Sequence, residues 1–305
     1  MKTVFITGGK GFIGRNLTEK LTALGYKVIA PSSSELNLLD EQAVDAFMRL
    51  EPVDLIVHAA NKGGGRNTME MRDVIGMNLR MFFNIVKHAD KVEKIIHFGS
   101  GAEYGKHKAI VLAHEEESDT ALPLDDYGFY KAVCSRYIQS LAGNVLNLRI
   151  FGCYGKYEDY RFKFISNAIV KNLIGLPITI RQNVYFDYIY IDDLMEMVVW
   201  AIENETRYHV YNMSKGEKVD LVSLAEVVNR VSARPSEILL ENKGLNLEYT
   251  SSNQRILEEV PLVFTSHDKA ISSLYEYYAE NVRSLDIETV KRDEYINKIS
   301  VAEKI

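Results

Sequence analysis

Short apolar runs alternate with longer amphipathic stretches in the first half of the chain. Five runs are rich in β-branched residues and carry little charge, as strands covered on both faces do: Thr3–Thr7, Lys27–Ala30, Leu55–Ala59, Lys94–Phe98 and Val145–Ile150. Between them, apolar residues recur near helical spacing in Phe12–Leu24, Glu41–Leu50, Met71–Ala89 and Tyr127–Ala142. This rhythm predicts a doubly wound α/β domain, in which crossover helices cover both faces of a parallel sheet.

The pattern loosens from about Cys153 onward. Helices are expected at Phe164–Ile174, Asp193–Glu203, Leu221–Val231 and His267–Val282, and strands at Pro177–Arg181, Tyr185–Ile191 and His209–Asn212. We therefore predict a large domain over residues 1–152 and a smaller α/β lobe over 153–285 that is interleaved with the end of the sheet. Residues 286–305, charged and weakly periodic, are expected to form a helical or frayed tail.

Composition and charge limit the partners of this chain. With 47% apolar and 26% charged residues among 305, it is expected to fold as an ordinary globular protein. A formal net charge of −6 argues against nucleic acid as a partner, and no apolar run is long enough for a signal peptide or a membrane span, so a cytoplasmic location is expected. Cys134 and Cys153 have neither disulfide nor metal-site spacing and are interpreted as core residues, and no metal is expected.

A glycine-rich turn directly follows the first apolar run. Gly8, Gly11 and Gly14 are spaced three residues apart and open the first helix, with Lys10, Phe12 and Ile13 between them. Such glycines allow a tight turn, a close approach of a pyrophosphate to the backbone and close packing of helix on strand, while the helix N-terminus faces the anion. The turn predicts a dinucleotide site and makes the large domain a Rossmann-type sheet.

The residues after the second strand bear on the choice of cofactor. Ala30–Ser34 lacks the acidic residue that binds the ribose 2′-hydroxyl of NAD, whereas Ser32, Lys10 and Arg15 are suited to a 2′-phosphate. NADP is therefore favoured over NAD, although the two cations could equally be solvated surface charges. Asp40 is a candidate partner for the adenine amino group and, alternatively, a helix N-cap.

Three residues form a candidate catalytic set. Tyr127 and Lys131 lie four residues apart, on one face of a helix, where an ammonium can bring the pKa of a phenol toward the working range. Ser100 follows the strand Lys94–Phe98, so its hydroxyl is expected in the crevice at the carboxyl ends of the strands. Tyrosine and lysine at this spacing are common in ordinary helices, and the pair gains weight only with the serine and the glycine turn.

The motifs together resemble those of the extended short-chain dehydrogenase/reductases, the nucleotide-sugar epimerase, dehydratase and reductase group. The resemblance runs in order from residue 3 to about 280, through the glycine turn, His58–Ala60, Asn78, Ser100 with Tyr104–Gly105, Tyr127 with Lys131, and Tyr188–Leu194. It implies a nicotinamide cofactor that contacts Ala59, Ala60 and Asn78, and a Ser–Tyr–Lys catalytic set. It also implies a C-terminal lobe for a nucleoside-diphosphate sugar, and commonly a homodimer formed by two helices of each subunit.

Departures from the family patterns narrow the expected reaction. The 4,6-dehydratases carry an Asp–Glu pair after the catalytic hydroxyl, but here Gly101 and Ala102 stand there, and Glu103 is expected to face away. Part of the chain is similar to GDP-L-fucose synthase, yet Ala102 replaces the cysteine used in epimerisation. No histidine occurs between His114 and His209, so C3/C5 epimerase activity is expected to be absent.

The substrate side is less defined by the sequence. Phe186 replaces the arginine that grips the diphosphate in the family, which leaves Arg161, Lys163, Arg181 and Arg255 as candidates, while Ser100, Gly101 and Ala102 are expected beside the sugar. For each cation, an ordinary surface charge is an equally good interpretation.

These observations favour reduction of a 4-keto group, or its reverse, at C4 of a nucleoside-diphosphate hexose or heptose. The principal alternative is a nucleotide-sugar 4-epimerase, which uses the same three residues. Against it stand the missing acidic residue after the second strand and the missing asparagine in Phe151–Cys153. A 4,6-dehydratase is less favoured, and a non-enzymatic regulator that keeps the dinucleotide fold is the rival from another class.

Overall fold

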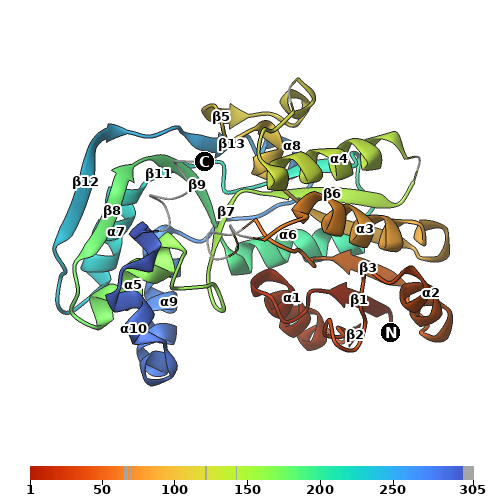
Figure 1. Cartoon of the computed structure of the whole chain (residues 1–305), viewed down its shortest axis with the longest axis horizontal. Helices are drawn as coiled ribbons and strands as arrows, with labels where there is room; N and C mark the ends of the chain where they lie inside the picture. Colours follow the sequence, from red (N-terminus) through yellow and green to blue (C-terminus); the bar gives the residue numbers. More distant parts are fainter. Residues whose placement is uncertain (65–67, 69–70, 121, 142, 298–305) are drawn as a thin grey trace.

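A computed structural model describes residues 1–64, 68, 71–120, 122–141 and 143–297. Its largest feature is a parallel sheet of six strands in the order β10-β6-β4-β3-β1-β2 (Figure 1). The strands are β1 (Thr3–Thr7), β2 (Lys27–Ile29), β3 (Leu55–His58), β4 (Lys94–Ser100), β6 (Val145–Ile150) and β10 (Val210–Met213). The order reverses between β1 and β3, so the sheet is doubly wound and Rossmann-type, as predicted.

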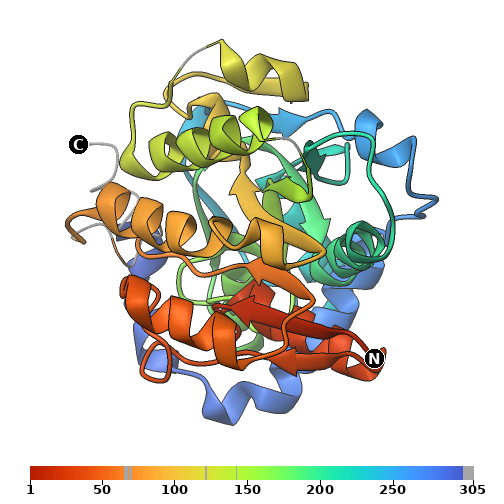
Figure 2. The same cartoon turned by 90° about the vertical axis from the view of Figure 1, so that its right-hand side faces the viewer.

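Two layers of helices cover the sheet because successive strand residues point to opposite faces. Phe5 packs in a core with α2 (Glu41–Leu50), α3 (Val74–Val86) and α4 (Asp126–Ser140). Its neighbours Val4 and Ile6 pack in another core with α1 (Phe12–Ala23) and α6 (Ile191–Glu203). Figure 2 shows α3 and α4 side by side on one face. The helix predicted from Met71 begins only at Val74, because Asp73 has a positive φ of 55°.

A smaller lobe is built around a separate core. Its sheets are β11-β9-β13-β5, with β7 also paired to β9, and β12-β8. The strands are β5 (Ile110–Ala113), β7 (Gly152–Tyr154), β8 (Ile178–Asn183), β9 (Tyr185–Tyr190), β11 (Lys218–Asp220), β12 (Ile238–Leu245) and β13 (Tyr249–Ser251). The helices are α5 (Phe164–Leu173), α7 (Leu221–Val231), α8 (Gln254–Leu257), α9 (His267–Asn281) and α10 (Ile287–Lys291); α8 lies against β10 of the large sheet. Short 3-10 turns lie at Ala89–Lys91, Gly101–Tyr104, Glu115–Asp119 and Val282–Ser284.

The two lobes exchange strands. β5 precedes residue 152 but pairs with β13 in the smaller lobe, whereas β10 follows residue 152 and completes the large sheet beside β6. The chain therefore passes between the lobes several times, and their contact places the ends of β1, β3 and β4 opposite the smaller lobe.

The C-terminal segment is docked as far as the structure describes it. Val290, Tyr295 and Ile296 are buried in the core that contains α5, α7 and α9. Residues 298–305 of the expected tail lie outside the described residues. Within the described ranges, no helix combines the length and the apolar character needed to cross a lipid bilayer.

Candidate active site

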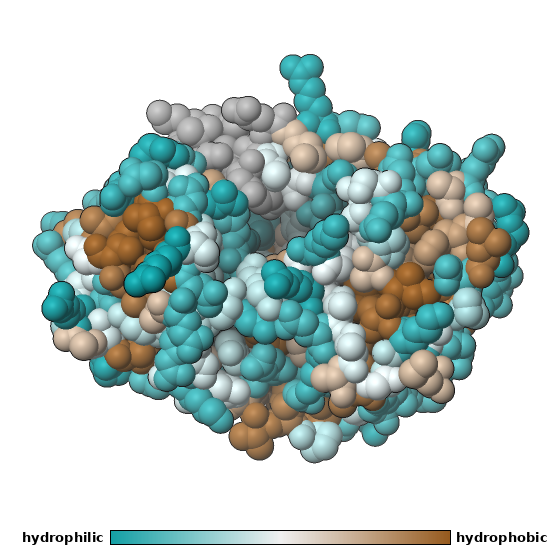
Figure 3. Space-filling model, turned by 90° about the horizontal axis from the view of Figure 1, so that it is seen from below, coloured by the Kyte–Doolittle hydropathy of each residue, from teal (hydrophilic) through white to brown (hydrophobic). Residues whose placement is uncertain are grey.

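A cavity of about 740 Å³ lies between the lobes, at the carboxyl ends of the parallel strands. From below, the surface is hollowed in this region, with apolar areas on either side (Figure 3). From the large domain the cavity is lined by the glycine turn, the ends of β3 and β4, and α4. From the smaller lobe it is lined by β8, β9, the start of α5 and the segment that leads into β13.

The glycine turn has the tight geometry that a dinucleotide requires. Gly8 has a φ of +70°, and a Cβ atom on it would lie 2.8 Å from the backbone nitrogen of Ala60. Gly14 lies against the carbonyl of Gly8, which accepts a hydrogen bond of 2.9 Å from Gly11 N. Of the predicted cofactor residues in this turn, Gly8, Gly11, Phe12, Ile13 and Gly14 line the cavity. A side chain at Gly8 or Gly14 would collide with neighbouring backbone and displace the turn that allows a pyrophosphate to approach the N-terminus of α1.

The end of β3 is held beneath this turn. Thr7 Oγ1 contacts His58 Nδ1 at 2.8 Å and accepts a hydrogen bond of 3.1 Å from Ala60 N. Ala59 lines the cavity, and Ala60 packs against Gly8. Burial and, to a smaller extent, the nearby Lys131 lower the pKa of His58 to about 3, so the imidazole is neutral at physiological pH.

Asn78 holds the segment that follows β3. Its buried side chain accepts a hydrogen bond from Lys62 N at 2.9 Å and donates to Lys62 O and Val74 O, each at 2.7 Å. These bonds leave Asn78 outside the cavity lining, while Asn61 and Gly64 of the segment that it holds belong to that lining. Asn78 thus shapes the cavity wall from behind.

Ser100, Tyr127 and Lys131 all line the same part of the cavity. The Ser100 hydroxyl lies close enough to Tyr127 to lower the pKa of its phenol. The Lys131 Nζ atom donates to the carbonyl of Phe98 and lies 5.9 Å from the centre of the Tyr127 ring. The helical spacing of Tyr127 and Lys131 therefore brings both side chains to the end of β4, where Ser100 is located.

The electrostatics of the pair differ from the sequence-based expectation. Burial raises the pKa of Tyr127, and the nearby Ser100 hydroxyl only partly opposes this rise. Burial also lowers the pKa of Lys131 to about 8. In this geometry Tyr127 is a neutral phenol at physiological pH, which is the protonation state of a proton donor.

Residues 4–214 match the family model described as "NAD dependent epimerase/dehydratase family". The chain belongs to this family. It is a nicotinamide-dependent enzyme of the extended short-chain dehydrogenase/reductase type, which confirms the resemblance drawn from the motifs.

Curated relatives and solved structures span nearly the whole chain. A GDP-L-fucose synthase of Sinorhizobium fredii is 23% identical over 92% of this chain and 96% of its own length. A dTDP-4-dehydro-6-deoxyglucose reductase of Escherichia coli is 26% identical over 74% and 80%. The structure of a GDP-mannoheptose C4 reductase from Campylobacter jejuni with NADP bound has a TM-score of 0.79 at 20% identity, covering 91% of this chain and 98% of that one. A UDP-glucose 4-epimerase from Thermotoga maritima with UDP-glucose also has a TM-score of 0.79 and 20% identity, over 92% and 99%.

The segment after β2, where the sequence analysis expected the cofactor ribose, contains a carboxylate that the sequence interpretation missed. Glu35 Oε2 accepts hydrogen bonds from Ser32 N at 2.7 Å and Ser32 Oγ at 2.6 Å, and Ser32 Oγ also contacts Ser34 Oγ at 2.9 Å. These bonds from Ser32 lower the pKa of Glu35. Lys10 is exposed nearby, outside the cavity lining. This family member therefore has an acid, Glu35, after β2 and a base, Lys10, in the glycine turn nearby.

Asp40 is the N-cap of α2 in this enzyme. Its carboxylate accepts a hydrogen bond of 3.1 Å from Ala43 N, and the residue does not line the cavity. Of the two interpretations of Asp40, the structure therefore contains the helix N-cap.

The candidate substrate cations fall into two groups. Lys163 and Arg181 line the cavity. Arg161 lies outside the lining and forms a two-pronged ion pair with Asp159, at 2.8 and 3.0 Å. Gly101 and Ala102 are buried directly behind Ser100 rather than in the cavity wall.

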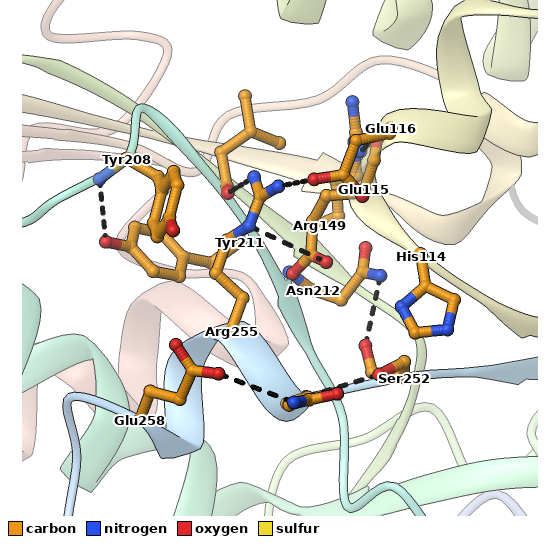
Figure 4. Close-up of polar contacts among 12 residues, drawn as sticks. His114, Glu115, Glu116, Arg149, Tyr208, Tyr211, Asn212, Ser252, Arg255 and Glu258 are labelled. Carbon is orange, nitrogen blue, oxygen red and sulfur yellow. Dashed lines mark hydrogen bonds and ion pairs between the residues drawn. The ribbon is translucent and has the colours of Figure 1, made fainter.

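Arg255 is also directed away from the cavity. It donates to the carbonyl of Val210 at 3.0 Å, forms an ion pair with Glu116, and lies over the Tyr208 ring at 4.2 Å (Figure 4). These contacts tie α8 to the start of β10 and to the turn at Glu115–Asp119, which is a structural role.

Glu103 faces away from the cavity, as the sequence suggested. Its Oε1 accepts from Ser100 N at 2.9 Å and its Oε2 from Arg149 Nε at 2.5 Å, with no solvent access to either charged side chain. Glu103 is therefore bound up in a buried network and does not line the cavity.

Sequence reasoning missed several side chains of the cavity wall, among them Lys106, Cys153, Glu158 and Tyr249. Cys153 was interpreted as a core residue, but it is half-buried on β7 and lines the cavity. Glu158 accepts a hydrogen bond of 2.5 Å from Ser166 Oγ, and burial raises its pKa to about 7. No local motif marks these residues, since only the approach of the smaller lobe brings them to the site.

Proposed function

We propose that this enzyme is a nucleotide-sugar oxidoreductase that reduces a keto group at C4 of a nucleoside-diphosphate hexose or heptose, or catalyses the reverse oxidation. The observation that carries the proposal concerns the positions that directly follow Ser100. Gly101 and Ala102, directly behind Ser100, have no titratable group, and Glu103 is held by Arg149. The Ser100–Tyr127 pair can transfer one proton at the reacting oxygen, and these three positions supply no acid and base for elimination.

The cofactor fits the glycine turn and the end of β3. Gly8, Gly11 and Gly14 would hold its pyrophosphate at the N-terminus of α1, and Lys131 would hold the nicotinamide ribose. When bound, the reduced nicotinamide supplies a hydride for C4. NADP is our first choice because Lys10 and Ser32 suit a 2′-phosphate, although Glu35 opposes this choice.

The residues of this chain handle the proton. Ser100 donates a hydrogen bond to the keto oxygen and so fixes its position beside Tyr127. Tyr127 gives its phenolic proton to that oxygen as the C–H bond forms at C4, and the ammonium of Lys131 stabilises the phenolate that remains. Oxidation runs through the same groups in reverse.

The relatives support the substrate class. Those named above include a GDP-L-fucose synthase, a dTDP-4-dehydro-6-deoxyglucose reductase and a GDP-mannoheptose C4 reductase. Lys163 and Arg181, on the smaller-lobe side of the cavity, are our candidates for the diphosphate.

One observation favours a 4-epimerase as the second candidate. Glu35 places a carboxylate after β2, where an enzyme that retains NAD uses an acid. An epimerase regenerates its cofactor in each turnover, whereas a reductase consumes it.

The deciding experiment incubates the purified enzyme with 4-keto and 4-hydroxy nucleotide sugars carrying GDP, dTDP, UDP or ADP. Net loss of reduced cofactor, followed by nicotinamide absorbance together with product NMR, is expected for a reductase. Inversion at C4 without net cofactor change would establish the epimerase and overturn our proposal.

We also propose a homodimer in the cytoplasm. Phe83 on α3 and Tyr137 on α4 contact each other at 5.0 Å and leave 39% and 38% of their surfaces exposed, so they form an apolar pair on the outer face of these helices. Both cysteines are free, as is typical of a reducing compartment. Sedimentation of the wild type and of Phe83→Glu tests the dimer, and an unchanged molecular mass would contradict this interface.

A further inference from the structure

Tyr249 brings a second phenol to the catalytic serine. The residue begins β13, a strand of the smaller lobe that pairs with β5 and with β9 at Phe186. Its ring packs against Phe151 at 4.9 Å and Phe186 at 5.6 Å. These contacts fix the ring in the cavity wall, and the hydroxyl points toward the end of β4.

The Tyr249 hydroxyl lies directly beside Ser100 and Gly101. The Ser100 hydroxyl lies close enough to both Tyr127 and Tyr249 to influence the pKa of each phenol. A Cβ atom on Gly101 would collide with the Tyr249 oxygen and would lie 2.8 Å from the Phe151 ring. Gly101 therefore leaves open the space that the Tyr249 hydroxyl occupies.

The Ser100 hydroxyl can take part in only a limited number of hydrogen bonds. A serine hydroxyl has one proton to donate and two lone pairs that accept. Ala102 N already donates to Ser100 Oγ at 3.1 Å. If Tyr249 donates to the second lone pair, the single proton of Ser100 must point to its remaining partner, which is Tyr127 in the empty site and the keto oxygen in the complex.

We propose that Tyr249 is a positioning residue that orients the Ser100 hydroxyl toward the reacting oxygen, and that Gly101 is required to admit it. The inference rests on the proposed oxidoreductase function, because it assigns Ser100 the same partner. Burial raises the pKa of Tyr249 well above its usual value, so its proton stays available for donation. Lys106 Nζ, 5.2 Å from the Tyr249 ring centre and 6.0 Å from that of Tyr127, places a cation at the faces of both rings.

The contact of Gly101 with Tyr249 also explains why this chain has glycine, and not the aspartate of the dehydratases, after Ser100. The position after Ser100 is where the dehydratase pattern carries an aspartate. No side chain fits there beside the Tyr249 hydroxyl, so the space of the dehydratase aspartate is occupied here by a phenol.

The test begins with Tyr249→Phe, which keeps the ring packing and removes only the hydroxyl. We expect kcat to fall about tenfold, the effect of one hydrogen bond at a reacting group, while KM and the cofactor dissociation constant stay unchanged. The control is Tyr208→Phe, a half-exposed tyrosine over Arg255. An unchanged kcat in Tyr249→Phe, or a loss matched by lower thermal stability, overturns the inference.

A second variant separates positioning from packing. Gly101→Ala is expected to lower kcat by displacing the same hydroxyl, so the double variant Gly101→Ala/Tyr249→Phe should lose much less than the product of the two single effects. If the loss of kcat in the double variant equals the product of the two single losses, the two substitutions do not act through the same hydroxyl.

An NMR measurement that needs no catalytic activity tests the role of Tyr249 separately from the proposed function. In protein with carbon-labelled tyrosine, the Tyr127 ring resonance, assigned with Tyr127→Phe, is expected to shift in Tyr249→Phe and in Ser100→Ala but not in Tyr208→Phe. A shifted resonance in an enzyme that reduces no 4-keto sugar refutes the proposed function alone, whereas an unshifted resonance refutes the role of Tyr249 alone.

Discussion

The guanidinium of Arg149 and the carboxylate of Glu103 meet at 2.5 Å with no access to solvent. Arg149 also donates to Tyr104, Ser118 and Ser135. A strand of the large sheet is thereby joined to the turn that begins at Ser100, and Glu103 in turn binds the backbone nitrogen of Ser100. A buried charge is tolerated only with such partners.

Glu103→Gln should therefore destabilise the fold strongly. The amide can still accept a hydrogen bond from Ser100 N, but it leaves the buried charge of Arg149 without an opposite charge. We expect the free energy of unfolding in urea to fall by about 3 to 5 kcal/mol. Glu93→Gln, at an exposed pair with Lys2, should change it by about 0.5 kcal/mol or less. Equal effects for the two variants would contradict a structural role for the buried pair.

Tyr127→Phe should abolish proton transfer and spare the fold. We expect kcat to fall by about 10² to 10⁴ with cofactor affinity nearly unchanged, since only the phenolic oxygen is removed. Tyr137→Phe, on the same helix but outside the cavity lining, serves as the control. Steady-state kinetics and fluorescence titration with NADPH make the comparison, and turnover retained in Tyr127→Phe would refute the catalytic assignment.

Because of Lys131, kcat/KM should fall at alkaline pH. Its pKa of about 8 lies below the usual 10.5, so the ammonium is present below pH 8 and is lost as the pH rises through 8. The kcat/KM for the reduced cofactor, which reports on the free enzyme, should decline above that pH. A profile that stays flat up to pH 10 would show that the charge of Lys131 is not needed.

Glu158 should make the stability of the enzyme depend on pH. Its folded pKa of about 7 is raised above 4.5, so the folded state holds an extra proton between these values and stability falls as the pH rises from 4.5 to 7. The cost above pH 7 is about 3 kcal/mol relative to pH 4.5. Glu158→Gln, which can still accept from Ser166, should therefore gain stability over the wild type at pH 8 but not at pH 4.5. Parallel unfolding curves at both values would contradict this.

Glu35 should influence the choice between NAD and NADP. Its carboxylate occupies the Ser32 backbone and hydroxyl groups that a 2′-phosphate would use, and it repels that phosphate. We expect Glu35→Ser to raise the ratio of kcat/KM for NADPH over NADH by about tenfold, and Lys10→Met to lower it. Glu41→Gln, exposed at the start of α2, is a matched charge control. An unchanged ratio in Glu35→Ser would remove this residue from the cofactor site.

Local pattern accounts for the parts of the fold that the sequence predicted. The bounds of β1, α2 and β6 agree with prediction because each is a strand covered on both faces or a helix with a marked apolar face. The glycine turn and the Tyr127–Lys131 pair were found because their chemistry requires fixed spacing within one element.

Tertiary context accounts for the parts that were missed. β12 was not predicted because most of its residues are exposed and Leu239 and Leu240 are adjacent, which breaks the alternation that marks a strand. Tyr249 reaches Ser100 across the cavity from another lobe, and Glu35 reaches Ser32 through a turn beyond the second strand. Neither relationship leaves a local pattern.

The exchange of strands between the lobes has a consequence for synthesis of the protein. The edge strand β10 ends at Met213, and the partner of β5 arrives only with β13 near residue 250. A nascent chain of about 150 residues therefore carries an unpaired edge on β6 and an unpaired β5, both able to pair with other chains. Folding on the ribosome can be completed only after most of the 305 residues have emerged, so these edges stay unpaired during much of translation.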